Sequence, residues 1–305
     1  MIRFKTIFFS VIIMIVVTAC EKEIAYQGDN LESFLVLNAS LQTDSAVTCY
    51  VSRSRTLLEK NPIQTIDDAV VELYSDDVFV EELKSFSNGM YKTEAVTILP
   101  ETQYELRVNH QAYKNVSASS VVPEKANAEF VSVKLVNVRT DGYTSEKMRF
   151  RVNLKDKPGK DYYRLKVYSP QWRYNDLGEY VYDENAYYLR DIDSNDPVLN
   201  GNVVVVDDDF SDHPENQYRV FNDELFDEEA YELTFELYEN DMELASNIKI
   251  DVQKISYDLY LYYKTLDAYN YYEDSPFSEP VRIHSNIING AGVMGSCTSN
   301  WLSVE

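Results

Sequence analysis

The strongest constraint on the fold of this chain is an alternation of apolar and polar residues with a period of two. Residues 47–53 and 69–74 alternate in this way, and this period places the apolar side chains of a strand on one buried face. Asp76-Asp77 and Asn88-Gly89 separate such runs, and the second dipeptide is typical of a tight hairpin turn. Tyr and Phe, which favour strands, contribute 25 and 13 residues. The sequence therefore predicts a mainly β fold.

The strands fall into two blocks. The first block, residues 34–123, contains about seven short strands, as expected for a β-sandwich of immunoglobulin or transthyretin-like type. In the second block, residues 124–305, the pattern resumes at residues 130–137, 147–154 and 162–168. Strands and helices do not alternate, which argues against an α/β sheet. We therefore expect two immunoglobulin/transthyretin-like β-sandwich domains.

One segment departs from the period of two and predicts a helix at about residues 252–271. Its apolar positions recur at intervals of three and four, as on one side of a helix. These positions are Ile255, Leu259, Tyr262, Leu266 and Tyr269. Neighbouring tyrosines widen the stripe, so we expect a Tyr-rich helix that is buried over much of its surface. Ser275-Pro276 ends it, and a Gly-containing tail follows.

Residues 1–19 have the parts of a secretory signal peptide. Arg3 and Lys5 precede an apolar run over residues 7–17. This run is too short to cross a membrane as a helix, which takes about 20 apolar residues. Small residues follow the run, as at a cleavage site.

The cleavage junction ends in V-T-A-C, where the cysteine is Cys20. It resembles a bacterial lipobox, in which the Cys thiol receives a diacylglycerol. We therefore expect a covalent lipid on Cys20, no other cofactor, and an acylated tether over residues 20–33. C-E-K-E at residues 20–23 resembles the acidic export signal of Bacteroidota lipoproteins, which predicts an outer-membrane protein facing the cell exterior. An ordinary signal peptide with a chance cysteine is the alternative.

Charge and motifs exclude several classes of function. The chain has 28 Lys and Arg against 51 Asp and Glu, for a net charge of −23, which disfavours nucleic acid and anionic lipid as partners. We find no zinc-protease, nucleophile-elbow or phosphate-loop motif and predict no enzyme activity. Paired carboxylates for glycoside hydrolysis remain open because they are defined by spatial separation. Cys49 and Cys297 either pair in an oxidising envelope or lie apart as buried thiols.

One acidic segment has partial metal-ligand spacing. Asp191, Asp193 and Asn195 copy the first half of a calcium loop, but Asp196 stands where that loop needs a Gly. Acidic residues cluster by chance in a chain of this charge. We therefore predict no metal site and keep these three residues as weak candidates.

Residues 169–202 form a polar, aromatic-rich stretch that we interpret as a long excursion from the sheet. Its aromatic residues are Trp172, Tyr174, Tyr180, Tyr182, Tyr187 and Tyr188. Exposed aromatic side chains supply large contact areas in interfaces and in sugar-binding sites. We predict that these residues bind a partner or ligand. The alternative is that they pack back onto the sandwich as loop anchors.

The tail carries the motifs SPFSEPV at 275–281, SNI at 285–287 and NGAGVMG at 289–295. Together with LVLNA at 35–39 and AVVELY at 69–74, they resemble the domain-of-unknown-function 4249 family of Bacteroidota outer-membrane lipoproteins. The resemblance covers essentially the whole chain after Cys20. Met294 and Ala291 depart from the residues usual there, which alters packing only, because the family has no established catalytic residues.

This resemblance implies an accessory binding subunit of an integral outer-membrane β-barrel complex. The barrel would be a TonB-dependent, SusC-like transporter or part of a barrel-assembly or secretion machinery. A carbohydrate-binding or carbohydrate-active envelope protein is the alternative.

Overall fold

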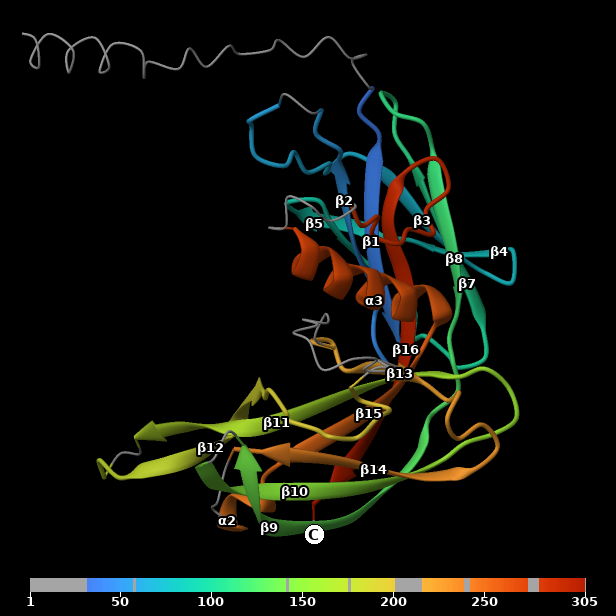
Figure 1. Cartoon of the computed structure of the whole chain (residues 1–305). Coiled ribbons are helices and arrows are strands. Elements are labelled where there is room, and N and C mark those ends of the chain that lie inside the picture. Colours follow the sequence, from blue (N-terminus) through green and yellow to red (C-terminus); the bar gives the residue numbers. More distant parts are fainter. Residues whose placement is uncertain are drawn as a thin grey trace, which may run out of the picture. The chain divides into compact units, whose positions relative to one another are not determined.

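The strands of the described residues form three sheets in the computed structural model of the chain (Figure 1). The structure describes residues 32–56, 59–140, 143–174, 177–200, 216–238, 242–273 and 280–304. The predicted signal peptide, Cys20 and nearly all of the predicted tether lie outside these ranges. No helix within the described ranges is long and apolar enough to span a membrane. Residues Ser33–Glu305 form one compact unit.

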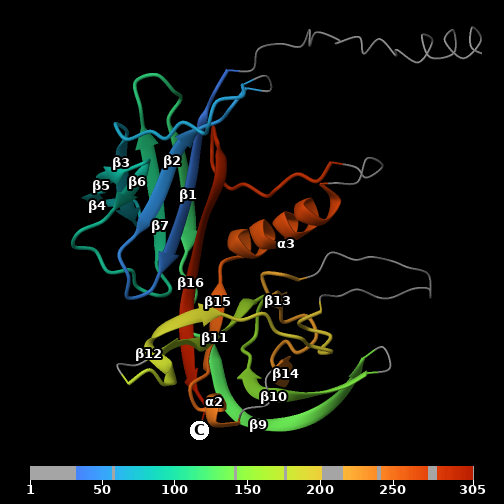
Figure 2. The ribbon, with the colours of Figure 1, turned by 90° about the vertical axis from the view of Figure 1, so that its left-hand side faces the viewer.

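The largest sheet has nine strands and extends through both halves of this unit (Figure 2). In spatial order its main path is β12 (Tyr180–Leu189), β11 (Tyr162–Tyr174), β15 (Lys249–Ile255), β16 (Ala291–Ser303), β1 (Leu35–Gln42), β2 (Thr48–Arg53), β6 (Met90–Lys92) and β5 (Lys84–Ser87). The short strand β13 (Val220–Asn222) pairs with β11 beside this path. β12 and β5 are therefore the two edges of the sheet.

Two smaller sheets complete the architecture. One contains β4 (Val78–Glu82), β3 (Val70–Ser75), β7 (Gln103–Asn109) and β8 (Val116–Val121), and the other contains β14 (Ala230–Leu237), β10 (Tyr143–Lys155) and β9 (Asn127–Thr140). Leu37 of β1 and Leu106 of β7 lie in one hydrophobic core, whereas Val167 of β11 and Phe150 of β10 lie in another. Each small sheet thus packs on part of the large one. The prediction of a mainly β, sandwich-type protein is confirmed.

Strand β16 belongs to both cores. It pairs in parallel with β1 and antiparallel with β15. Met294 lies in the first core, and the Asn300 side-chain amide donates hydrogen bonds to the Ala126 and Ala128 carbonyls of the second. The sequence boundary between residues 34–123 and 124–305 stays a prediction. In space, β16 from the second block pairs with β1 from the first.

The predicted start of the helix is wrong. Helix α3 spans Tyr257–Tyr272, and residues 252–255 belong to strand β15, every residue of which is buried from Ile250 onward. A strand buried on both faces has no alternation, so its apolar residues imitate the helical stripe. Within α3, Leu259 and Asp267 are the buried residues. The expectation of extensive burial is therefore also wrong. The short helix α2 (Met242–Ala245) has no counterpart among the predicted elements.

The interpretation of residues 169–202 as an excursion from the sheet is wrong for most of its length. β11 continues to Tyr174 and the chain returns as β12, which forms an antiparallel hairpin at the edge of the large sheet. The register shifts between Pro170 and Gln171, and a bulge of this kind interrupts the alternation. That interruption, together with many polar residues, gives the sequence of this hairpin the character of a loop.

The two remaining thiols lie apart. Cys49 and Cys297 are free and buried. Cys49 lies in the first sandwich core, whereas Cys297 lies with Leu259 and Ile255 in a separate cluster under α3. Burial raises the pKa of Cys49 to about 12 and that of Cys297 to about 11, so both are unreactive thiols near neutral pH.

Candidate binding site

The hairpin β11–β12 presents a cross-strand aromatic pair. Trp172 and Tyr182 face each other in the register of the two strands, and their ring centroids are 3.8 Å apart. Side chains directly opposite each other in an antiparallel pair make such contacts. Trp172 remains 43% exposed. Tyr182 is half-buried and packs against the second core. Trp172 therefore supplies the exposed part of this pair on the outermost hairpin of the sheet.

The other predicted aromatic residues are distributed along the same hairpin. Tyr174 is 71% exposed and pairs in register with Tyr180, of which the structure describes the backbone. Tyr188 is exposed, and its hydroxyl accepts a hydrogen bond of 3.0 Å from Arg190. The structure brings Trp172 and Tyr182 together but directs Tyr187 elsewhere.

Tyr187 lines a pocket of about 410 Å³ at the ends of strands β12, β15 and β16. The other lining residues are Ser246, Asn247, Ile248, Lys249, Trp301, Leu302 and Ser303. The Lys249 ammonium lies over the Tyr187 ring, 3.6 Å from its centroid. This is a cation–π contact. The pocket therefore combines an aromatic wall with a positive charge.

Trp301 forms a second aromatic side of this pocket. It is 52% exposed and packs against Tyr168 of β11, with ring centroids 5.6 Å apart and planes inclined by 40°. β16 carries Trp301 into this position because it pairs with β15, which in turn pairs with β11. Sequence reasoning missed Trp301. The available signal was a tryptophan, one of only two, among small polar residues.

A desolvated carboxylate lies beside Trp301 in the sheet. Asp251 pairs with Trp301 in register and is 1% exposed. Its Oδ2 accepts hydrogen bonds from Gln253 Nε2 at 2.7 Å and Ser299 Oγ at 3.0 Å, whereas its Oδ1 has no partner among the described residues. Burial raises the pKa of Asp251 and lowers that of Lys166 on the neighbouring strand. The sheet face beside the pocket is thus polar but shielded from water.

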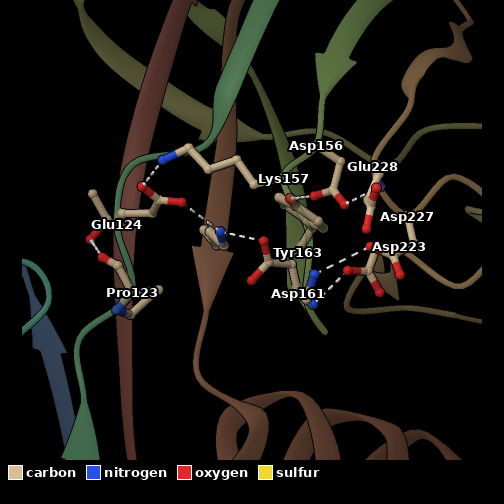
Figure 3. A network of polar contacts seen from close by, with 12 residues as sticks. Pro123, Glu124, Asp156, Lys157, Asp161, Tyr163, Asp223, Asp227 and Glu228 are labelled. Atoms are coloured by element: carbon tan, nitrogen blue, oxygen red, sulfur yellow. Dashed lines mark hydrogen bonds and ion pairs between the residues drawn. The ribbon is translucent and has the colours of Figure 1, made fainter.

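An acidic cluster occupies a different place, beside the segment that connects the two cores (Figure 3). Carboxylate oxygens of Asp156, Asp161 and Asp223 lie within 4.8 Å of one another. Oxygen ligands of this kind suit a hard cation. However, Tyr163 donates a hydrogen bond to Asp156, and Lys254 forms an ion pair with Asp161.

The other contacts of this network also pair the acidic side chains with groups of the protein itself. The Asp161 backbone N–H donates to Asp223 Oδ2 at 2.6 Å, and burial raises the pKa of Asp223. Lys254 also contacts Glu124 at 3.1 Å. We therefore assign this network to the connection between the cores and not to a ligand site.

Of the three weak metal candidates, Asp193 is engaged in a fold contact, an ion pair of 2.7 Å with Lys147. The neighbouring Asp196 carboxylate accepts hydrogen bonds from Tyr231 Oη and the Thr234 N–H. Asp191 and Asn195 are exposed. Within the described ranges, Asp191 and Asp193 belong to no cluster of acidic ligands. This segment thus ties its loop to β14.

Fold and site together define a mainly β protein whose two cores share one sheet and which carries a group of aromatic residues at one edge of that sheet. The sequence model of the family described as "Domain of unknown function (DUF4249)" matches residues 21–301. The chain belongs to this family, as the tail motifs indicated.

Other comparisons add little. No curated protein matches the sequence significantly. One similar solved structure, of a protein from Corynebacterium diphtheriae named as membrane anchored, has 13% sequence identity and a TM-score of 0.21. The match covers 88% of this chain and 60% of that chain. A TM-score this low carries no argument about fold or function.

Proposed function

We propose that this protein is a lipid-anchored binding subunit on the outer membrane that docks onto an integral β-barrel protein through the hairpin β11–β12. The barrel is a TonB-dependent, SusC-like transporter or a component of barrel-assembly or secretion machinery. The observation that carries this proposal is the set of exposed aromatic side chains on an edge hairpin of the large sheet.

The hairpin combines two properties of an interaction surface. β12 is the last strand of its sheet, so one side of its backbone has no strand partner among the described residues, and such an edge favours pairing with another chain. Trp172 and Tyr174 supply exposed aromatic area, and Trp, Tyr and Arg dominate the binding energy of interfaces. Arg173 lies between them. A barrel protein with a flat, polar extracellular rim would contact this surface without entering the sandwich cores.

The anchor part of the proposal depends on Cys20. A diacyl group contributes about 0.8 kcal/mol for each buried CH₂, so two chains outweigh any contact of an acidic protein surface with lipid. Anchoring in the membrane would keep the hairpin at a high local concentration near membrane-embedded partners.

The binding test is native purification in mild detergent followed by identification of co-purifying proteins. Trp172→Ala should reduce recovery of the barrel partner by about tenfold or more, as expected for loss of a binding hot spot, with little change in melting temperature. Tyr50→Ala is the matched control, because Tyr50 is similarly exposed but lies on β2 in the other half of the sheet. A lowered melting temperature with unchanged recovery would instead make Trp172 a structural residue and remove the hairpin from the proposal.

The anchor is tested separately by Cys20→Ala. This variant should move from the membrane fraction to the soluble envelope fraction. Sedimentation with outer membranes in high salt, in a strain without the partner, would contradict lipid attachment at Cys20. We propose no catalytic activity, and hydrolysis of any member of a glycan panel by the purified chain would contradict that part.

A further inference from the structure

We infer that the pocket between Tyr187 and Trp301 binds an acidic saccharide, with a sugar ring against Trp301 and a carboxylate of the sugar against Lys249. Tyr187 belongs to the same hairpin as Trp172, but saccharide binding in the pocket does not depend on docking at Trp172. The inference rests on the shape, the aromatic sides and the charge of the pocket.

The pocket has the size and lining of a small-molecule site. Its volume of about 410 Å³ falls in the range of ligand pockets, roughly 300–1,000 Å³. Aromatic rings and small polar side chains share its lining, the latter being Ser246, Asn247 and Ser303. A sugar ring has the same division, with an apolar C–H face and a rim of hydroxyl groups.

Trp301 is placed to stack against a ring. The face of an indole carries negative potential and attracts the positively polarised C–H groups of a sugar. Tyr168 supports Trp301 from the neighbouring part of the sheet, at 5.6 Å between ring centroids. Because Trp301 pairs in register with Asp251 of β15 and packs against Tyr168, its position is fixed before the ligand binds, which lowers the entropic cost of binding.

Lys249 selects for an acidic ligand. Lys249 is exposed at the pocket. It contacts the Tyr187 ring and forms no ion pair within the described part of the chain. Tyr187 holds the ammonium at the pocket without neutralising it. A carboxylate on the ligand would add a charge-assisted hydrogen bond. A cationic ligand would be repelled by the same ammonium.

Binding can be followed by tryptophan fluorescence. The chain has two tryptophans, so Trp172→Phe leaves Trp301 as the only fluorescent reporter. The same substitution removes the Trp172 indole from the proposed docking surface. The full-length protein in detergent would be titrated with uronic-acid trisaccharides, including trigalacturonic acid, and with the neutral galactotriose. We expect the uronic acids to change the Trp301 emission saturably and to bind at least tenfold more tightly than galactotriose.

Two variants assign the contacts. Lys249→Met, which keeps the length of the side chain, should weaken binding of the uronic acids by about tenfold and remove the preference over galactotriose, while Lys249→Arg should retain both. Trp301→Ala should abolish binding in calorimetry. Tyr50→Ala should bind normally. Circular dichroism melting of each variant establishes that it is folded.

Three results would overturn the inference. They are no binding of any uronic acid tested, equal affinity for galactotriose, and unchanged affinity in folded Lys249→Met protein. Because Trp172→Phe is present in the fluorescence titration, saccharide binding that persists while barrel co-purification is lost would separate this site from the docking function. If Trp172→Phe alone removed both saccharide binding and barrel co-purification, the ligand would bind at Trp172, and the inference would also be overturned.

Discussion

Replacement of Asp267 by Asn should remove a specific part of the pH dependence of stability. Asp267 lies on α3 and is 6% exposed. Neither carboxylate oxygen makes a hydrogen bond of normal geometry within the described residues. Burial raises the pKa of Asp267 to about 6, although Lys264 and the nearby backbone N–H groups of Tyr218 and Gln217 act to lower it. An Asp in the unfolded chain titrates near 3.8.

The magnitude follows from these two values. A difference of roughly two pH units corresponds to ~3 kcal/mol. The folded state binds the proton more tightly than the unfolded state, so the contribution of protonated Asp267 is fully present below pH 3.8 and is lost as the pH rises through about 6. Ionised Asp267 therefore opposes folding at neutral pH. The side-chain amide in the Asp267→Asn variant would be neutral throughout, so the variant would show no such loss.

The assay is urea unfolding of the wild type and of Asp267→Asn at a series of pH values between 4 and 7. All other titrating groups are common to both proteins, so the difference between their free energies of unfolding isolates this residue. We expect that difference to shift by ~2–3 kcal/mol in favour of the variant as the pH rises. Asp191→Asn, at an exposed position, controls for loss of one negative charge. Parallel stability curves for wild type and Asp267→Asn would refute the reasoning.

Two further stability predictions come from the packing of α3 and β16. Leu259→Ala should lower the free energy of unfolding in urea by ~2–5 kcal/mol, because Leu259 lies on the buried side of α3. Leu266→Ala should lower it clearly less, because Leu266 is half-buried. Equal losses would contradict the observed burial. Gly292→Ala should prevent folding or lower the melting temperature strongly, because φ is +111° and an added Cβ would lie 2.1 Å from the Leu37 carbonyl oxygen. Gly159→Ala is the control, with a positive φ but open space around it; a melting temperature of Gly292→Ala equal to that of the control would show that β16 can move away from β1.

Local patterns are sufficient for the strands of the first sandwich and for the fold class. They predict strands over residues 47–53 and 69–74, and these segments form β2 and β3. Each of these strands buries alternate residues, so the polarity of successive side chains indicates which face of the strand is buried. The family is also recognisable, because its tail motifs are contiguous in sequence.

The errors occur where burial does not alternate. β15 is buried on both faces, and its pattern predicts the start of a helix. The hairpin β11–β12 contains a bulge, and its pattern resembles an excursion from the sheet. The burial of β15 depends on β11 and β16, which are distant in sequence, and the bulge depends on the register between β11 and β12. A local period contains no information about either.

The candidate site is predictable only in part. The aromatic content of residues 172–188 is evident from the sequence, and the structure concentrates these residues on one hairpin. The sequence does not indicate Trp301 and Lys249, because they reach Tyr187 through pairings between segments that are distant in sequence.

The sequence alone determined that this chain is mainly β, because side-chain alternation is a local property of each strand. It also determined the family, because the motifs are short and contiguous. Only the tertiary structure decided that one sheet serves both cores, since β16 reaches β1 from the other end of the chain. The pairing of β16 with β15, and of β15 with β11, likewise places Trp301 in the Tyr187 pocket. Strand order depends on contacts between distant segments, and no pattern within a single segment specifies its neighbour.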